Sequence, residues 1–228
     1  MEDSGTFFVD KNVSWSSFHV VSKVRNLLRQ HFGKKVKIGH AGTLDPLASG
    51  MLILCYGSKT KEISSYQNLE KEYTGCFVLG ATTPSFDMET EVDRHFPTEH
   101  IDDELLQKTT EQFKGTILQR PPLFSAKWVE GERAYHLARK GEEHILPPHQ
   151  VEIHEFEITE RRGDEVFFRV RCGKGTYIRS LARDFGQALS SGAYLKGLRR
   201  TAIGPYRVDE AKTVDELARM LSIKKKEN

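Results

Sequence analysis

The spacing of apolar residues along the chain predicts short strands separated by amphipathic helices. Apolar or alternating runs predict strands at residues 7–9, 51–56, 71–80, 151–158, 166–172 and 195–203. Apolar residues three and four positions apart predict helices at residues 17–31, 102–113, 133–139, 176–189 and 214–221. Because hairpin-like strand pairs are interrupted by helices, without regular βαβ alternation, the pattern predicts an α+β fold with a mainly antiparallel sheet.

Local signals predict where some of these elements begin and end. Ser16 and Ser17 are suitable N-caps for the first helix, and Gly33 ends it. Thr176 is the expected N-cap of the helix at 176–189. The strand at 151–158 has one slip in its alternation, which predicts a β-bulge.

The pattern leaves one long connection, at residues 34–50, which is rich in Gly, Thr, Asp, Pro and Ser. A structureless loop of this length in a compact domain is usually functional or disordered. Because regular elements flank it on both sides, we interpret this loop as functional.

Composition fits a water-soluble globular chain. Its 228 residues are 38% hydrophobic, and the longest fully apolar run, 51–56, is far shorter than the roughly 20 residues of a membrane-spanning helix. The acidic N-terminus has no secretory signal. Three widely spaced cysteines form neither a zinc pattern nor a disulfide framework, which predicts reduced thiols and a cytoplasmic location: Cys55, Cys76 and Cys172.

Charge is segregated although the net charge is only +2. Residues 23–37 carry six basic residues and no acid. A second basic set follows Cys172: Lys174, Arg179, Arg183, Lys196, Arg199, Arg200 and Arg207. Such segregation could build one basic face for a phosphate backbone, but charge alone favours ordinary solvated helix faces.

Common nucleotide, hydrolase and metal motifs are absent. Residues 57–60, Gly-Ser-Lys-Thr, lack the spacing of a phosphate-binding loop, and neither G-x-G-x-x-G nor G-x-S-x-G occurs. The nine histidines form no H-E-x-x-H arrangement, so nothing predicts a metal site.

Three segments could carry chemistry. Residues 40–50 place Asp45 before Pro46 on a loop of small residues, where an acid is preorganised as a nucleophile or base, although an Asx-turn is the commoner reason for such an acid. Residues 171–179 place Lys174 between two glycines before a helix, which suits a phosphate, although a plain glycine turn with Tyr177 in the core fits equally well. Tyr73 begins a strand and could stack on a base, although core packing is the commoner role.

Together these segments resemble the bacterial tRNA pseudouridine-55 synthases, the TruB family. The matching segments are the loop 40–50, Lys-Glu-Tyr at 71–73, the Pro-Pro segment 119–127, 131–141, 174–179 and Leu-Arg-Arg at 198–200. They occur in the family's order and the likeness runs from about residue 7 to 221. It implies the pseudouridine synthase fold, a mainly antiparallel mixed sheet flanked by helices, with the catalytic loop over a central cleft.

Three departures from the family pattern stand out. Residues 11–14 read Lys-Asn-Val-Ser where the family usually has Lys-Pro-x-Gly. Residues 83–87 read Thr-Pro-Ser-Phe-Asp in place of Thr-Asp-Thr-x-Asp, so only the first residue and the final acid, Asp87, are kept. Family members commonly carry a further C-terminal RNA-binding domain; we expect one catalytic domain at residues 1–221 and a basic tail at 222–228.

The resemblance implies a role for each site residue. Asp45 is the nucleophile, attacking either the sugar or the base, and Arg179 is the partner of its carboxylate. Tyr73 stacks on the flipped uracil and is a candidate to handle the proton at C5. The remaining residues bind substrate: Tyr177 and Leu198 line the uracil pocket, His40 props the rearranged loop once the base is out, and Lys174 holds phosphate.

The implied reaction isomerises a uridine in the T-loop of tRNA, through base flipping, without cofactor or metal. We expect a monomer that binds the tRNA T-arm, with no guide RNA and no membrane. Three other functions remain open: a tRNA-folding chaperone, a pseudouridine synthase with another RNA target, and a hydrolase using Asp45, which would lack a base and metal set.

Overall fold

The computed structural model describes residues 3–125, 128–129, 132–133 and 146–223. The predicted helix at 133–139 beyond its first residue, the family-like segment at 134–141 and the lysine tail at 224–226 lie outside these residues. Within the described chain, no helix combines the length and apolarity needed to cross a bilayer.

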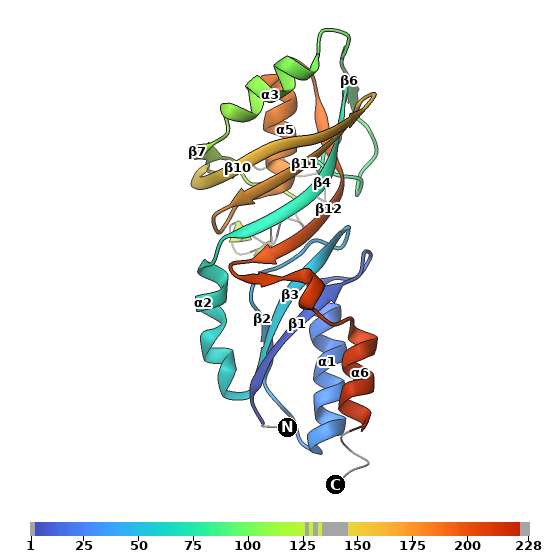
Figure 1. Cartoon of the computed structure of the whole chain (residues 1–228), viewed down its shortest axis with the longest axis vertical. Coiled ribbons are helices and arrows are strands. Elements are labelled where there is room, and N and C mark those ends of the chain that lie inside the picture. The colour runs from blue at the N-terminus through green and yellow to red at the C-terminus, as the bar shows by residue number, and fades with distance from the viewer. Residues whose placement is uncertain (1–2, 126–127, 130–131, 134–145, 224–228) are drawn as a thin grey trace. The chain divides into compact units, whose positions relative to one another are not determined.

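The described chain forms two compact units, which are described separately (Figure 1). Unit 1 contains the residues up to Tyr73 and those from Leu198 onward, and unit 2 contains Thr74–Gly197. The chain passes from unit 1 to unit 2 within strand β4 (Lys71–Leu79) and returns within strand β12 (Ala193–Ile203).

Unit 1 is built on a small mixed sheet. Strand β1 (Gly5–Lys11) pairs antiparallel with β3 (Ala48–Tyr56), and β2 (Ile38–His40) also pairs antiparallel with β3. The end of β12 joins β3 in parallel, with Arg200 opposite Gly50, and then pairs antiparallel with β13 (Tyr206–Arg207). β3 is apolar at nearly every position because elements cover both of its faces.

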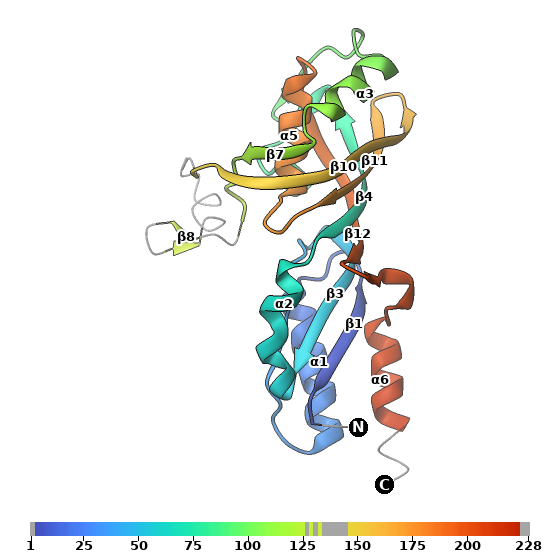
Figure 2. The same ribbon diagram turned by 60° about the vertical axis from the view of Figure 1, so that its left-hand side comes forward.

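Two helices lie side by side in unit 1, α1 (Ser17–Phe32) and α6 (Val214–Ile223) (Figure 1). Figure 2 shows the same helices turned by 60°, with α1 behind β1. They share one apolar core with the strands, whose fully buried members include Val20, Val24, Leu28, Leu52, Leu54 and Leu217. The caps of α1 are confirmed. The Ser16 hydroxyl accepts the His19 N–H at 3.1 Å, and Gly33 ends the helix with φ +69°.

Unit 2 is an antiparallel sheet backed by two helices. The strand order is β12, β4, β11 (Glu165–Cys172), β10 (His149–Arg162) and β7 (Gly115–Gln119). Helices α3 (Asp103–Glu111) and α5 (Ile178–Ala188) contact each other, and α3 contacts β10. Stacked and edge-on rings fill the core between sheet and α5: Phe77, Phe113, Phe156, Phe168 and Phe185.

Several short elements complete the two units. A 3-10 helix (Gly57–Glu62) and α2 (Ile63–Asn68) connect β3 to β4. Two-residue strands pair as β5 (Ala81–Thr82) with β6 (Arg94–His95), and β8 (Trp128–Val129) with β9 (Glu132–Arg133). A further 3-10 turn (Val208–Glu210) precedes α6. Elements this short contain too few residues to show a hydrophobic period, so the sequence did not predict them.

The predicted α+β, mainly antiparallel fold is confirmed, and so is the bulge. The β10–β11 register shifts at Ile153/Glu155, where the alternation slips, and shifts again at Ile158/Glu160. All three cysteines are buried and none forms a disulfide, as expected of reduced thiols.

Two predictions of local structure were wrong. The loop at 34–50 is shorter than predicted, because β2 occupies 38–40 and β3 already begins at Ala48; residues 41–47 remain irregular. The sequence does not show this start of β3 because Gly50 lacks the apolar side chain typical of a strand. The glycine is needed there, since a Cβ at Gly50 would lie 2.3 Å from the Arg200 carbonyl oxygen of the paired strand. Thr176 is not the cap of α5. Its hydroxyl donates to the Gly173 carbonyl at 3.0 Å, and the helix begins at Ile178.

Ser14 adopts the backbone conformation of the glycine that it replaces in the family's Lys-Pro-x-Gly segment, here residues 11–14. It has φ +70°, a left-handed conformation that suits the glycine usual in the family at this position. Its N–H donates to the Pro46 carbonyl at 2.8 Å, so the turn after β1 is joined to the 41–47 loop.

Replacing Ser14 with Gly should therefore stabilise the protein. We expect the free energy of unfolding to rise by about 0.5–1 kcal/mol, because glycine removes the left-handed strain but adds entropy to the unfolded chain. Urea unfolding measures the change. Ser14→Ala is the matched control, since it keeps the strain; an equal gain from both variants would contradict this explanation.

Candidate functional site

The 41–47 loop of unit 1 holds Asp45 in a fixed backbone geometry. The loop is tied to β3 by the Ala41 N–H, which donates to Ile53 O at 2.9 Å, and a turn forms where the Ala48 N–H donates to Asp45 O at 3.1 Å. One buried hydroxyl, that of Ser17, donates to Leu44 O at 3.0 Å and accepts from Leu44 N at 2.9 Å. The carboxyl-bearing residue is half-buried. These hydrogen bonds fix the loop backbone on both sides of Asp45.

A fully buried arginine holds the N-terminal side of this loop. The Arg200 guanidinium donates from Nη2 to Gly42 O at 3.1 Å and from Nη1 to Thr43 O at 3.4 Å, while Nε donates to Met51 O at 2.8 Å. One rigid fork thus fastens the loop to the adjacent strand β3. Sequence reasoning placed Arg200 in a basic set and in the family-like Leu-Arg-Arg segment, but gave it no role in holding the loop.

A fully buried lysine holds the C-terminal side of the loop. The Lys11 ammonium donates to Trp15 O at 2.6 Å, Asn12 O at 3.0 Å and Pro46 O at 3.5 Å. Burial lowers the pKa of Lys11 to about 8; the Asp45 carboxylate opposes this shift, and the nearby Arg200 charge adds to it. Two buried cations therefore bracket Asp45, and Lys11 is a second residue whose role sequence reasoning missed.

His40 is the last residue of β2 and lies half-buried before the loop. Burial lowers the pKa of this imidazole below its ordinary value, and the charge of Arg200 lowers it further, while a hydrogen bond with the Gly42 backbone opposes both. Its Nδ1 atom is buried without a hydrogen-bond partner. The ring is therefore held in its neutral form, with one polar atom still to be satisfied.

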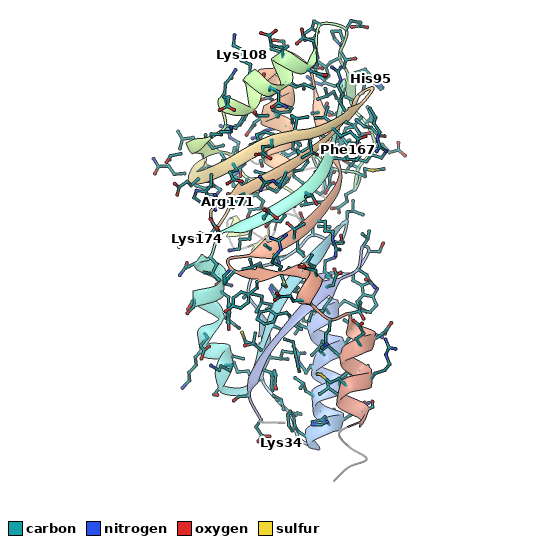
Figure 3. All side chains as sticks on the ribbon, viewed as in Figure 1. Lys34, His95, Lys108, Phe167, Arg171 and Lys174 are labelled. Carbon is teal, nitrogen blue, oxygen red and sulfur yellow. The ribbon has the colours of Figure 1, made fainter. Side chains whose placement is uncertain are left out.

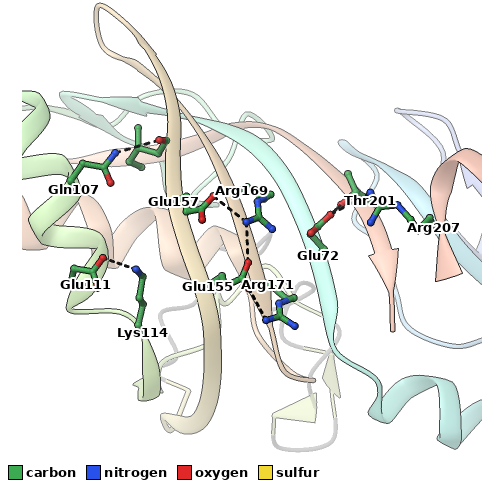
Figure 4. Close-up of polar contacts among 11 residues, drawn as sticks. Glu72, Gln107, Glu111, Lys114, Glu155, Glu157, Arg169, Arg171, Thr201 and Arg207 are labelled. Carbon is green, nitrogen blue, oxygen red and sulfur yellow. Dashed lines mark hydrogen bonds and ion pairs between the residues drawn. The ribbon is translucent and has the colours of Figure 1, made fainter. Parts of the chain in front are cut away.

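Tyr73 lies on a stretch of β4 that neighbouring side chains anchor. The Lys71 ammonium donates to Gln67 O and Leu69 O, each at 2.6 Å. The Glu72 carboxylate accepts from the Thr201 hydroxyl at 2.7 Å and lies 3.9 Å from the Arg207 guanidinium (Figure 4). Tyr73 itself is 8% exposed. The Lys-x-Tyr spacing thus has a structural basis: Lys71 fixes the turn before the aromatic residue.

Leu198 is half-buried on β12, where it pairs with Ala48 of β3, three residues beyond Asp45. Unit 1 therefore contains four of the predicted site residues: His40, Asp45, Tyr73 and Leu198.

Unit 2 contains the other three, of which Arg179 is the most buried. It is 4% exposed in the first turn of α5; its Nε lies 3.7 Å from the Asp87 carboxylate, and Nη1 donates to Ser85 O at 3.4 Å. Asp87 is equally buried and accepts the Glu89 N–H at 2.9 Å. Asp87, the acid kept from the family pattern, is thus the residue that orients Arg179.

The glycine turn at residues 173–176 has a different geometry from that predicted. Gly175 has φ +80°, and Lys174 is exposed on the turn that follows Arg171 at the end of β11 (Figure 3). The Tyr177 N–H, at the start of the helix, donates to the buried Gln119 side chain at 2.8 Å and is not open to a phosphate. The Tyr177 ring is half-buried and lies edge-on to His149, so it is not a core residue.

Most of the second basic set is paired with acids. Carboxylates lie within salt-bridge distance of Arg179, Arg183, Lys196, Arg199 and Arg207. The outer face of β10 and β11 is similarly balanced, with Arg169 between Glu155 and Glu157 at 3.0 and 3.1 Å (Figure 4). Among the described residues, no group of three His, Cys, Asp or Glu side chains could hold a metal ion.

Comparison with protein families identifies two matches. Residues 29–178 match the family described as TruB family pseudouridylate synthase, N-terminal domain, and residues 179–228 match tRNA pseudouridylate synthase B, C-terminal domain. A protein of Flavobacterium johnsoniae, named tRNA pseudouridine synthase B, is 55% identical over 89% of this chain and 90% of its own length. One of Phocaeicola vulgatus with the same name is 48% identical over 96% and 94%.

Solved structures show the same fold. A Cbf5-Nop10-Gar1 complex contains a chain that is 28% identical with a TM-score of 0.72, covering 95% of this chain and 54% of that chain. An archaeal box H/ACA sRNP Nop10-Cbf5 complex gives 25% identity and a TM-score of 0.71, over 99% and 56%. The present chain thus spans about half the length of these two.

Replacing Arg200 with Lys should loosen the loop at residues 41–47. A lysine cannot reproduce the planar fork, so the Gly42 and Thr43 carbonyls lose their donors, and the free energy of unfolding should fall by about 2–4 kcal/mol. Hydrogen exchange measures the local effect, which should be faster exchange at residues 41–47. Arg207→Lys, at an exposed arginine of the same unit, is the control. Equal exchange in both variants would exclude the clamp.

Lys11 should make stability depend on pH in the alkaline range. Its pKa is about 8 in the folded protein against an ordinary 10.5, so between these values the unfolded chain binds a proton that the folded protein lacks. The cost of burying the charge is therefore fully present below pH 8 and disappears as pH rises toward 10.5.

Urea unfolding of wild type and Lys11→Met at several pH values tests this, because the difference cancels the other titrating groups. The wild type should gain stability relative to the variant between pH 8 and 10. Parallel stability profiles would show that Lys11 titrates normally.

Proposed function

The chain belongs to the TruB family of pseudouridylate synthases, and from that membership we propose that it converts uridine 55 in the T-loop of tRNA to pseudouridine. The observation that supports this most directly is the Asp45 loop, a half-buried carboxylate on a backbone held from both sides by buried cations. The names of the relatives, which align over most of their length, supply the tRNA substrate.

The reaction moves a bond within one nucleoside. The bond between C1′ and N1 of uridine breaks, the uracil rotates, and a bond from C1′ to C5 forms. The proton at C5 is lost and N1 becomes protonated, so the product has the mass of the substrate. Nothing is oxidised, reduced or transferred to another molecule, and the residues must supply only a nucleophile, a proton path and a pocket.

Asp45 is the proposed nucleophile, whether it attacks the sugar or the base. Lys11 and Arg200 donate hydrogen bonds to the loop carbonyls, so both fix the backbone that carries the carboxylate. Arg179 is the proposed partner of this carboxylate during the reaction, and Asp87 holds the Arg179 guanidinium ready for it.

The remaining predicted residues are proposed to bind the flipped nucleotide. Tyr73 stacks on the uracil and is the candidate for handling the C5 proton, and Tyr177 and Leu198 line the base pocket. His40, neutral and with an Nδ1 atom that has no hydrogen-bond partner, props the rearranged loop of the RNA once the base is out. Lys174, exposed on its turn, binds a phosphate.

The proposed partner is the T-arm of tRNA alone, without guide RNA, bound by a monomer in the cytoplasm. A T-loop presents splayed bases, which lowers the cost of extracting the target, a few kcal/mol for a stacked base. The likeness to chains of Cbf5 complexes keeps another RNA target as the second candidate, but this chain spans about half of those chains.

Asp45→Asn should abolish isomerisation while leaving tRNA binding intact. The amide keeps the size of the side chain but cannot act as a nucleophile, so the rate should fall by at least about 10⁴-fold. Pseudouridine mapping on an unmodified tRNA transcript measures the product, and wild type should give one new pseudouridine in the T-loop.

Four other outcomes have distinct meanings. Salt-sensitive tRNA binding without pseudouridine in either protein would favour the folding chaperone. A pseudouridine outside the T-loop would favour another target. A mass change in the RNA would indicate hydrolysis, and unchanged turnover in Asp45→Asn would remove Asp45 from its role.

A further inference from the structure

One long segment of unit 1 carries positive charge without any acid. Between Asp10 and Asp45 the chain has no Asp or Glu. It contains seven Lys and Arg residues, of which Lys11 is buried and Lys34 pairs with Asp3. The other five are exposed: Lys23, Arg25, Arg29, Lys35 and Lys37. Within the part of the chain that the structure describes, none of these five has a carboxylate within 4 Å.

This arrangement differs from the ordinary solvated face that charge alone would suggest. Solvated helices usually alternate the sign of their charges and form ion pairs along the surface. Three arginines elsewhere in the described chain follow that rule, as the pairs of Arg162, Arg169 and Arg199 show. Helix α1 instead leaves its cations to solvent, which raises the positive potential above it.

Four residues along one side of α1, of which Phe18, Arg25 and Arg29 are exposed, form a line that begins beside the catalytic loop. Phe18, Ser22, Arg25 and Arg29 are spaced by four, three and four residues and therefore lie on one side of the helix; we call them the α1 stripe. From Phe18 to Arg29 the stripe is about 16 Å long, at roughly 1.5 Å per residue. Phe18 follows Ser17, whose hydroxyl is bonded to Leu44 of the loop.

The end of the stripe nearest the loop is apolar and exposed. Phe18 is 68% exposed, so most of its ring is open to solvent. Val13 and Leu47 are also exposed, and the residues next to them are joined by the Ser14 N–H to Pro46 O bond. Arg29, at the other end, lines a hollow of about 440 Å³ with Asn26 and Gln30, whose amides can donate hydrogen bonds.

We propose that the α1 stripe is a second contact surface for the substrate RNA, separate from the uracil pocket. Phe18 stacks on an unpaired base next to the target uridine, and Arg25 and Arg29 bind the phosphates that follow along the same strand. Aromatic side chains stack on any base, and arginine binds phosphate through two parallel hydrogen bonds. The inference rests on the proposed function only in taking the bound RNA to be the substrate.

Direct binding of an unmodified tRNA transcript tests the charged part of the stripe. Arg25→Gln/Arg29→Gln should weaken binding about tenfold and lower the slope of log K against log salt by about 1.5, because two phosphate contacts are lost. Lys114→Gln/Arg162→Gln is the matched control, since it removes two exposed cations that pair with acids. The control should bind like wild type.

Phe18→Ala tests the apolar end, with Leu118→Ala as control because Leu118 is equally exposed, at 69%, on β7. Loss of stacking should weaken binding about fivefold or more in Phe18→Ala alone. Neither residue is buried, so both variants should keep wild-type thermal stability.

Equal binding by the stripe variants and their controls would overturn the proposal, and so would a wild-type protein that does not bind tRNA. Failure of the proposed function is a separate result, read from pseudouridine mapping. If the wild type binds tRNA without isomerising it, and the stripe variants bind more weakly, the proposed enzyme activity is wrong and the α1 stripe is supported.

Discussion

The hydrogen bonds from the buried Arg200 guanidinium to the backbone of the Asp45 loop are the interaction on which the site of unit 1 depends. A guanidinium cannot shed its proton, so once buried it must find acceptors or cost several kcal/mol of stability. Here the acceptors are carbonyls of Gly42, Thr43 and Met51. The loop cannot move away without leaving a buried charge unsatisfied, and its rigidity follows from that cost.

Lys11 constrains the loop from the other side of Asp45 in the same way, but its charge can titrate. Its ammonium can lose a proton, and its lowered pKa shows that burial has already weakened the charged form. The pair therefore combines a permanent cation with a titratable one, and the two hold the loop on either side of the proposed nucleophile Asp45. Arg179 in unit 2 is held differently, because a buried carboxylate, that of Asp87, lies beside it in addition to the Ser85 carbonyl oxygen.

The cations of this protein fall into two groups, those that hold the fold and those that are exposed on α1. Cations that fix the fold are buried or paired: Lys11, Arg179, Arg199 and Arg200. Within the described chain, the cations on α1 form no such contacts and are exposed. Because α1 begins at the loop that carries Asp45, an unpaired basic helix at that place gives the substrate backbone a path leading away from the reacting base.

The sequence by itself determined the elements whose signals are local. The apolar period and the caps Ser16 and Gly33 predicted α1, the slip in alternation predicted the bulge in β10, and the ordered motifs identified the family. Local patterns carry this information because neighbouring residues share one helix or strand. Asp45, Tyr73 and Arg179 came from motif likeness, and their roles in the reaction stay predictions.

Only the tertiary structure decided what holds Asp45 in place. Arg200 donates to Met51 O across 149 residues of sequence, and Ser17 bonds to Leu44 across 27, so no local period could reveal either contact. The sequence also failed to predict strand β2, a three-residue strand with a glycine at its centre. It misplaced the start of α5, because the Thr176 hydroxyl bonds to the Gly173 carbonyl instead of capping the helix. Hydrogen bonds between distant segments form only once the chain has folded, and a sequence pattern records the residue types but not the partners.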